Sequence, residues 1–369
     1  MSILNRLLDE CIRHPKELPD SLFLTDDEKA RIQSVAEQYP ICIPPYYLNL
    51  VDGKRQDDPI RKLCIPSGME ESFEGLADTS GENMNTVVTG MQHKYANTAL
   101  ILTTNQCSMY CRHCFRKRMV GSSAEEVAGN IDLMTDYIRR HPEIDNVILS
   151  GGDALINDNA RIRMYLESFS SIDGIRTIRI ATRVPVVLPA RIYEDVELQE
   201  LLGEYGKKKQ LVVVTHFNHP RELTDAAKQA VQVLMEAGCP VRNQTVLLKG
   251  VNDSSAVLSE LMSRLVSVGV MPYYVFQCRP AMGVMNQFQV PLMTGRKIVE
   301  EAKASMNGLA KGFRYVMSHV SGKIEILGSA CREGEMLFQY HQAKDQSDHA
   351  RMFTHRIEEK QCWLPDAIG

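Results

Sequence analysis

Three cysteines fall within eight residues of this chain, in the stretch CSMYCRHCFRKR at positions 107–118. Cys107, Cys111 and Cys114 have the spacing CxxxCxxC, and thiolates suit zinc or iron–sulfur clusters. A structural zinc site needs a fourth ligand at comparable spacing. The nearest one, His113, adjoins Cys114, so both side chains could hardly face one metal without strain. A cubane held by three cysteines leaves one iron open for a substrate or cofactor. The alternatives are three buried thiols or a zinc knuckle.

The elements that would position this loop begin at Ala99, where short β-branched runs alternate with amphipathic stretches. The runs are ALILTTN, NVILSGG, TIRIATR, QLVVVTHF, VRNQTVLL and MPYYVFQC. Six β/α units at this spacing predict a parallel sheet with right-handed crossovers. The runs are apolar nearly throughout, as strands covered on both faces are. The pattern predicts an α/β fold, as a barrel, a partial barrel or an open doubly wound sheet.

Polar residues stand at the end of each run. In chain order they are TTNQC, SGGD, ATR, THFNH, NQ and QCR. Parallel α/β folds place their sites at the carboxyl ends of the strands. The sequence therefore predicts one functional face, on which the cysteine loop lies.

Helix signals precede and separate the strands. The stretch TDDE at 25–28 has capping-box spacing, and residues 127–138 repeat apolar side chains at helical spacing. Thr224 begins another helix, with Gly238 as its left-handed C-cap, and Asp253 can cap a third.

Three regions follow from this pattern. Residues 1–90 read as helical with loops and no repeated strand, and residues 91–290 hold the barrel. Residues 291–369 hold one more helix, two short strands (FRYVMSH and KIEILG), a lysine-bearing segment between them and a charged tail.

The composition is that of an ordinary globular chain. With 369 residues it can form one large domain with appendages, or two domains. The net charge of −4 gives no reason to expect binding to nucleic acid or to an anionic membrane.

No apolar run approaches the roughly 20 residues that span a bilayer. The N-terminus lacks a signal-peptide core, and the ten cysteines do not look like a disulfide framework. We expect a cytoplasmic protein.

The cysteine motif, placed after the first strand of a partial barrel, resembles the radical S-adenosylmethionine (SAM) superfamily. The stretch TTNQCSMYCRHCFRKRMVG resembles the lysine 2,3-aminomutase family in particular. The similarity continues through SGGDAL, ATRVPVVLPARI, THFNHPREL, QTVLLKGVND and PYYVFQC, and it covers roughly residues 40–328. The resemblance implies a partial (β/α)6 TIM-like barrel with a helical N-terminal extension and a short C-terminal extension.

The resemblance implies that Cys107, Cys111 and Cys114 hold a 4Fe-4S cluster whose free iron chelates SAM. An electron from a donor of flavodoxin or ferredoxin type would then release a 5′-deoxyadenosyl radical. The cofactor carries this chemistry, and the protein supplies placement and exclusion of water.

Five further residues match positions that surround SAM in the family. Gly151, Gly152 and Asp153 follow the second strand, where the family segment lies along the methionine moiety and glycine lets backbone approach a ligand. The alternative is a plain βα turn. His216 and Gln244 end the fourth and fifth strands and would line the same cavity, although a lone histidine is often only a hydrogen-bonded structural residue.

Pyridoxal phosphate (PLP) is implied by Lys323, which matches the lysine that forms a Schiff base with it. Such a lysine needs a lowered pKa. Lys94 and Tyr95 match an Arg-Tyr pair near the cofactor phosphate. Two features depart from the family: its glycine run before the lysine is mostly lost, and Thr98 replaces a second phosphate-binding arginine. The alternative for Lys323 is a solvated lysine between two short strands.

The substrate positions differ most from the family. Arg116 matches the arginine that grips the substrate carboxylate, a task for a planar bidentate donor. Where lysine-specific enzymes bind the distal ammonium with two aspartates, this chain has Arg279 and Val316. A guanidinium in a desolvated pocket would repel that ammonium. We therefore expect a substrate other than lysine, such as glutamate or aspartate, unless Arg279 pairs instead with Glu325 or Asp153.

The C-terminal region also departs from lysine enzymes, which bind zinc between subunits through late cysteines. Here Ser254 occupies one of those positions, and only Cys331 and Cys362 remain in the tail. A homo-oligomer, if formed, is expected to lack this zinc link.

These features together predict a radical SAM isomerase that moves an amino group from Cα to Cβ of a small amino-acid substrate. A second hypothesis keeps the radical machinery and drops PLP. A third is a zinc-binding protein without catalysis, which would be colourless, whereas the enzyme should be brown with about four irons per chain.

Overall fold

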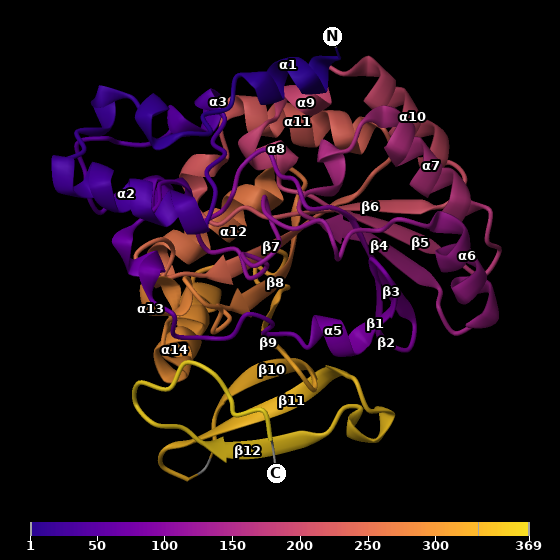
Figure 1. The fold of residues 1–369 in the computed structure, drawn as a ribbon. Helices are drawn as coiled ribbons and strands as arrows, with labels where there is room; N and C mark the ends of the chain where they lie inside the picture. The colour runs from indigo at the N-terminus through magenta and orange to yellow at the C-terminus, as the bar shows by residue number, and fades with distance from the viewer. Residues whose placement is uncertain (1, 331, 368–369) are drawn as a thin grey trace.

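The computed structural model describes residues 2–330 and 332–367 (Figure 1). Twelve strands form one sheet in the order β1 to β12, each hydrogen-bonded to the next. Strands β3 to β9 are parallel. Their bounds are Thr98–Thr104, Asn146–Gly151, Thr177–Ala181, Gln210–Thr215, Val241–Leu247, Met271–Gln277 and Arg314–His319. The six predicted strands are β3 to β8, and β9 adds a seventh parallel strand.

Helices connect the parallel strands on the outside of the curved sheet (Figure 1). The principal ones are α6 (Ile131–Arg140), α7 (Asn159–Ser170), α10 (Val196–Gly206), α11 (Asp225–Glu236), α12 (Ser255–Ser267) and α14 (Leu292–Ala304). Shorter ones are α8 (Val184–Val187), α9 (Ala190–Tyr193), α13 (Met285–Phe288) and the 3-10 helices η4 (Ala154–Ile156) and η5 (Pro220–Glu222). The predicted α/β fold with a TIM-like partial barrel is thus confirmed.

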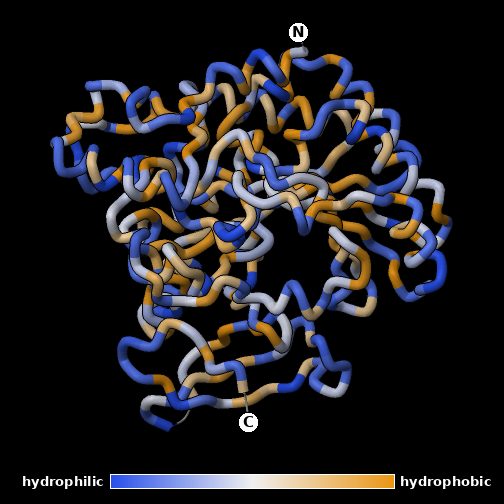
Figure 2. Tube along the Cα trace, viewed as in Figure 1, coloured by the Kyte–Doolittle hydropathy of each residue, from blue (hydrophilic) through white to orange (hydrophobic). Residues whose placement is uncertain are grey.

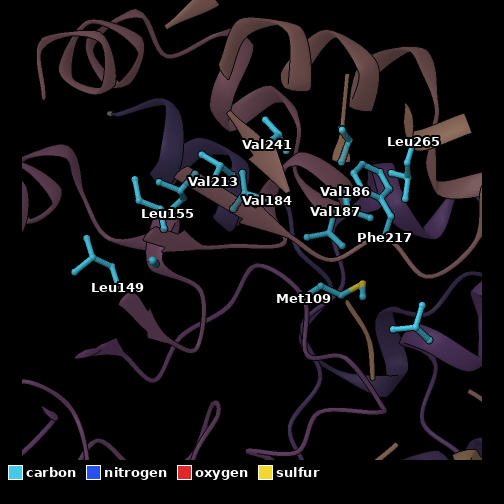
Figure 3. Packing of buried hydrophobic residues seen from close by; sticks show 14 of the residues in the cluster. Met109, Leu149, Leu155, Val184, Val186, Val187, Val213, Phe217, Val241 and Leu265 are labelled. Carbon is cyan, nitrogen blue, oxygen red and sulfur yellow. The ribbon is translucent and has the colours of Figure 1, made fainter. Parts of the chain in front are cut away.

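Apolar side chains of these helices face the strands. Along the tube in Figure 2, apolar and polar residues alternate in the helices, as in amphipathic elements. One core cluster joins the helices to the parallel sheet through every second strand residue, such as Ala99 and Ile101 of β3 and Val147 and Leu149 of β4. Figure 3 shows part of it, including Val213 and Val241 of the sheet and Val184, Val186 and Phe217 from the connections.

The N-terminal region is helical, as predicted. It holds α1 (Ile3–Asp9), α2 (Asp26–Gln38), α3 (Pro45–Leu48), α4 (Pro59–Cys64), α5 (Glu82–Asn85), η1 (Pro15–Glu17), η2 (Asp20–Leu22) and η3 (Gly68–Glu71). The capping box is present, since the Glu28 backbone N–H donates to Thr25 Oγ1 over 3.2 Å and the Thr25 N–H donates to Glu28 Oε2 over 2.8 Å. Two short strands, β1 (Thr86–Val88) and β2 (Met91–Tyr95), then pair antiparallel and lead into β3.

The charged tail proved to be part of the sheet. Strands β10 (Gly322–Ser329), β11 (Glu335–Ala343) and β12 (Met352–Arg356) extend β9 antiparallel, with η6 (Gln346–Asp348) before β12. They form the lowest part of the view in Figure 1. Met336, Phe338 and Tyr340 are buried at every second position of β11. This period of two is the pattern of a half-buried strand, which the sequence analysis overlooked in the tail.

One helix cap also differs from the prediction. Ser254, and not Asp253, is the N-cap of α12, because its hydroxyl accepts from the Val257 N–H. Asp253 instead accepts from the Gly250 N–H over 2.8 Å. The predicted Thr224 cap and the positive φ of Gly238, 80°, are both observed.

None of the helices in the part of the chain that the structure describes has the length and apolar character needed to cross a membrane. Cys331 lies outside the described residues.

Candidate functional site

A cavity of about 380 Å³ lies inside the curved sheet. Its walls come from the cysteine loop, from the parallel strands and from β2 and β10. All thirteen residues predicted for the site line it, namely Cys107, Cys111, Cys114, Gly151, Gly152, Asp153, His216, Gln244, Lys94, Tyr95, Arg116, Arg279 and Lys323. The tertiary structure therefore brings together residues that the sequence spreads over more than 200 positions.

The N-terminal region holds the cysteine loop from outside the barrel. The backbone N–H of Tyr110 donates to the carbonyl of Cys42, and that of Arg112 donates to the carbonyl of Leu63, each over 3.0 Å. These bonds fix the backbone on both sides of Cys111. The helical extension thus contributes to the shape of the candidate cluster site.

A buried carboxylate reinforces this loop. Glu70 of η3 is fully buried and pairs with Arg112 over 2.5 Å and with Lys117 over 2.6 Å. The pairing matters because a buried charge without a partner is strongly destabilising. Arg112, inside the cysteine motif, and Lys117, just after it, are therefore structural cations.

Burial raises the pKa values of the Cys107 and Cys114 thiols. Thiolates at these positions thus need the positive charge of a bound metal group, which deprotonates coordinating thiols. Among the described residues, no three His, Cys, Asp or Glu side chains converge on one point that could hold a single metal ion. In a cubane each cysteine binds a different iron, so the three cysteines fit a cluster without such convergence.

Gly151, the last residue of β4, and Gly152, which follows it, are needed for packing within the protein. A Cβ on Gly152 would lie 2.2 Å from the Gln106 carbonyl oxygen, and one on Gly151 would lie 2.3 Å from that of Thr104. Gly151 also has a φ of +116°, which favours glycine. The sequence analysis assigned this freedom to a ligand, but here it lets β4 approach the start of the cysteine loop.

Asp153 is engaged by protein donors. Its carboxylate accepts from Thr182 Oγ1 and the Arg183 N–H, each over 2.6 Å, and from the Leu155 N–H over 3.0 Å. Asp153 thereby orders the turn after β5. What the segment can offer a ligand is its backbone position.

Two histidines lie beside the cysteines with unsatisfied nitrogens. Both ring nitrogens of buried His113 and Nε2 of His216 have no hydrogen-bond partner within the protein. The rings meet edge to face at 5.4 Å. Burial lowers the pKa of His113 well below its usual range and that of His216 to about 3, so both are neutral. Orphaned buried polar atoms facing a cavity suit a polar ligand such as SAM.

Lys323 has the environment of a reactive amine. Its Nζ donates to Gln342 Oε1 over 3.1 Å and lies 4.3 Å from the centroid of the Tyr274 ring. Burial, and then the nearby Arg179, Arg279 and Lys94, lower its pKa to about 7. The alternative of a solvated lysine is not what the structure shows.

Lys94 is held beside the same end of the cavity. Its Nζ donates to the backbone carbonyl of His319 over 2.6 Å and points toward that of Ser80 at 3.4 Å. Burial and Arg279 lower its pKa to about 7. Burial raises the pKa of the neighbouring Tyr95 phenol.

Arg179 is a cavity residue that the sequence reasoning missed. It lines the cavity from β5, and its Nε donates to Asn146 Oδ1 over 3.0 Å. Asn146 Nδ2 in turn donates to Thr98 Oγ1 over 2.9 Å. Through Asn146, Arg179 thus links a guanidinium to the position where Thr98 replaces the family's arginine. The available signal was a cation in the middle of an otherwise apolar strand, TIRIA.

Arg116 is paired within the cavity wall. Its guanidinium binds Glu82 over 2.8 Å and donates to Ser150 Oγ over 3.1 Å and to the Gly151 carbonyl over 3.2 Å. Glu82 also pairs with Arg118 over 2.6 Å. Two cations therefore share one buried carboxylate.

Arg279 is not neutralised in this way. The partners considered for it are occupied, since Glu325 pairs with Arg314 over 2.5 Å and Asp153 binds the turn after β5. Among the described residues, Arg279 makes no ion pair, and its one side-chain hydrogen bond is a 3.4 Å contact with Thr79 Oγ1. Burial lowers its pKa to about 10, so it stays cationic at neutral pH. Val316, the other substrate position, is fully buried outside the cavity lining.

Comparisons with a family model and with known proteins all point to the same family. The model of the Radical SAM superfamily matches residues 101–261. A relative from Aquifex aeolicus (strain VF5) is 38% identical over 93% of this chain and 91% of its own length. The L-lysine 2,3-aminomutase of Clostridium subterminale is 38% identical over 79% of this chain and 70% of its own. The glutamate 2,3-aminomutase of Clostridioides difficile (strain 630) is 35% identical over 78% and 67%.

Proposed function

This chain belongs to the lysine 2,3-aminomutase family of radical SAM enzymes, and from that premise we propose that it is a PLP-dependent 2,3-aminomutase of an acidic amino acid. The family makes it an isomerase of the aminomutase type and implies a 4Fe-4S cluster and SAM. The observation that carries the substrate proposal is the guanidinium of Arg279 in the cavity, which forms no ion pair with any residue that the structure describes.

The residues fit PLP. Lys323 offers a partly neutral amine beside aromatic faces. For a phosphate group, Arg179 offers a cation and Lys94 an amine whose pKa of about 7 a bound dianion would raise. Arg179 compensates in charge for the arginine that Thr98 replaces. When bound, PLP would hold the migrating nitrogen and supply a conjugated system that delocalises an unpaired electron. The chain's own part is to hold the phosphate and substrate and to keep water out.

The substrate side of the cavity fits two carboxylates. Arg116 and Arg279 both lie against the ring of Phe115, with guanidinium carbons 4.8 Å and 4.0 Å from its centroid. Arg116 suits the α-carboxylate, as the family resemblance implies, and Arg279 suits the side-chain carboxylate of glutamate or aspartate. A lysine ammonium beside Arg279 would meet an uncompensated like charge at low effective dielectric, which disfavours lysine.

A borohydride trap tests the PLP part of the proposal. Anaerobically purified protein is supplied with PLP, reduced with borohydride and mapped by peptide mass spectrometry. We expect a phosphopyridoxyl group on Lys323 in the wild type and none at that position in Lys323→Ala. Protein that cleaves SAM but carries no adduct would contradict PLP dependence and favour the radical SAM hypothesis without PLP.

A product screen tests the substrate part. Purified enzyme with SAM, PLP and a reductant is offered glutamate, aspartate and lysine in parallel, and β-amino acids are detected by mass spectrometry. We expect a β-amino acid from glutamate or aspartate and none from lysine. Turnover of lysine alone would contradict the assignment of Arg279.

A further inference from the structure

One buried cation touches the cysteine motif directly. Nη1 of Arg183, in the turn after β5, donates to Cys111 Sγ at 2.8 Å. Arg183 is 7% exposed, and arginine stays protonated in proteins. A permanently charged guanidinium therefore contacts one of the three thiols that are proposed to hold the cluster.

The same guanidinium is held in place on its other sides. Nη2 donates to Glu222 Oε1 over 2.5 Å and to the Tyr47 hydroxyl oxygen at 3.2 Å, and Nε donates to the His216 carbonyl over 3.1 Å. Its backbone N–H is bound by Asp153 over 2.6 Å. Arg183 has few alternative positions, so its contact with Cys111 is enforced by the fold.

Glu222 is itself fixed and fully buried. It accepts from the Tyr47 hydroxyl over 2.6 Å and from the backbone N–H groups of Asn218 and His219 over 2.5 and 2.9 Å. These donors stabilise its negative charge in addition to Arg183. A row of hydrogen bonds therefore runs from the carboxylate of Glu222 through the guanidinium of Arg183 to the thiol of Cys111, a proposed cluster ligand.

We propose that Arg183 is a positioning residue that sets the reduction potential of the cluster through Cys111. The inference rests on the proposed function, because it requires Cys111 to bind iron. Reduction adds one electron to the cluster and its thiolates, and hydrogen bonds and net charge at the sulfurs are among the factors that set cluster potentials. The Arg183 cation stabilises the reduced form and raises the potential, while Glu222 partly offsets it.

The test is a redox titration of the reconstituted full-length holoprotein, followed by electron paramagnetic resonance, with iron and sulfide content measured on each sample. At a fixed solution potential, Arg183→Met is expected to lower the ratio of reduced to oxidised cluster about tenfold. For a one-electron couple this corresponds to a reduction potential lower by about 59 mV. Arg183→Lys keeps the charge and is expected to recover much of this shift. Glu222→Gln is expected to move the potential in the opposite direction.

The matched control is Arg191→Met. Arg191 is another fully buried arginine of the barrel, paired with Asp195 and bonded to Asn159, and it touches none of the three cysteines. We expect its loss to leave the potential unchanged, even if it lowers stability.

The outcomes separate the inference from the proposed function. A wild-type protein that takes up no iron and sulfide would contradict the proposed function, and the inference with it. A loaded Arg183→Met cluster at the wild-type potential would overturn the inference alone. If the Arg183→Met variant holds no cluster, the Glu222→Gln variant tests the inference instead. A cluster in Glu222→Gln with the wild-type reduction potential would overturn the inference. A purely structural role predicts lower iron content at an unchanged potential.

Discussion

Arg279 stacks on Phe115, with its guanidinium carbon 4.0 Å from the ring centroid. Phe115 stands between Cys114 and Arg116, so the stack ties the proposed substrate-binding cation to the cysteine loop. Contacts of this kind contribute about 0.5–2 kcal/mol, more when desolvated. The cluster motif and the proposed side-chain recognition site are thus neighbours through one ring, although 165 positions separate Cys114 from Arg279 in the chain.

Replacing Arg279 by methionine should weaken recognition of an acidic substrate. A hydrogen bond to a charged group contributes about 1.5–3 kcal/mol, so kcat/KM for the acidic amino acid should fall roughly 10- to 100-fold. Arg279→Lys retains the charge and should lose less. Steady-state kinetics on glutamate and aspartate check this. Equal kcat/KM in wild type and Arg279→Met would place side-chain recognition elsewhere.

Lys323 should react with amine reagents at a lower pH than an ordinary lysine. Because burial and neighbouring cations disfavour its charged form, its pKa lies at about 7, and the neutral, reactive fraction rises through pH 7 and levels off above it. Competitive acetylation followed by mass spectrometry from pH 5 to about 11 measures this profile, with exposed lysines of the chain as internal reference. Labelling of Lys323 that keeps rising up to pH 10 would contradict the lowered pKa.

Single serine substitutions at Cys107, Cys111 and Cys114 should each abolish stable iron binding. The wild type is expected to hold about four irons per chain after anaerobic reconstitution, and each variant close to none. Cys239→Ser is the matched control, since Cys239 is fully buried but does not line the cavity. Iron and sulfide analysis gives the answer. Stoichiometric zinc in place of iron would support the zinc-binding hypothesis.

Glu70→Gln should destabilise the protein and loosen the cysteine loop. Removing one partner of a buried ion pair costs about 3–5 kcal/mol, because Arg112 and Lys117 are left without their carboxylate. Urea denaturation of the cluster-free protein measures the loss in free energy of unfolding. Glu301→Gln removes an exposed charge near Lys297 and should change the stability little. An equal, small effect of both substitutions would contradict the structural role of Glu70.

Much of the fold followed from local patterns. The β-branched runs set the parallel strands, Thr25 and Thr224 set two helix starts, and CxxxCxxC after the first strand set the position of the cysteine loop. These features depend on neighbours within a few residues, so the sequence carries them directly. The sequence analysis missed β11, although its buried residues Met336, Phe338 and Tyr340 follow the period of two that marks a half-buried strand.

The candidate site also has features that the sequence predicts and features that only the tertiary structure determines. Residue types and spacing, with the family resemblance, were sufficient to name the cysteines and Lys323, and they left open which carboxylate Arg279 would meet. Only the tertiary structure decided that Glu325 is taken by Arg314, that Asn146 links Arg179 to Thr98, and that Arg183 reaches Cys111. Each of these contacts joins residues from separate elements of the sheet and its turns. Their partners are set by how the strands pair and how side chains pack, which no local pattern in the chain encodes.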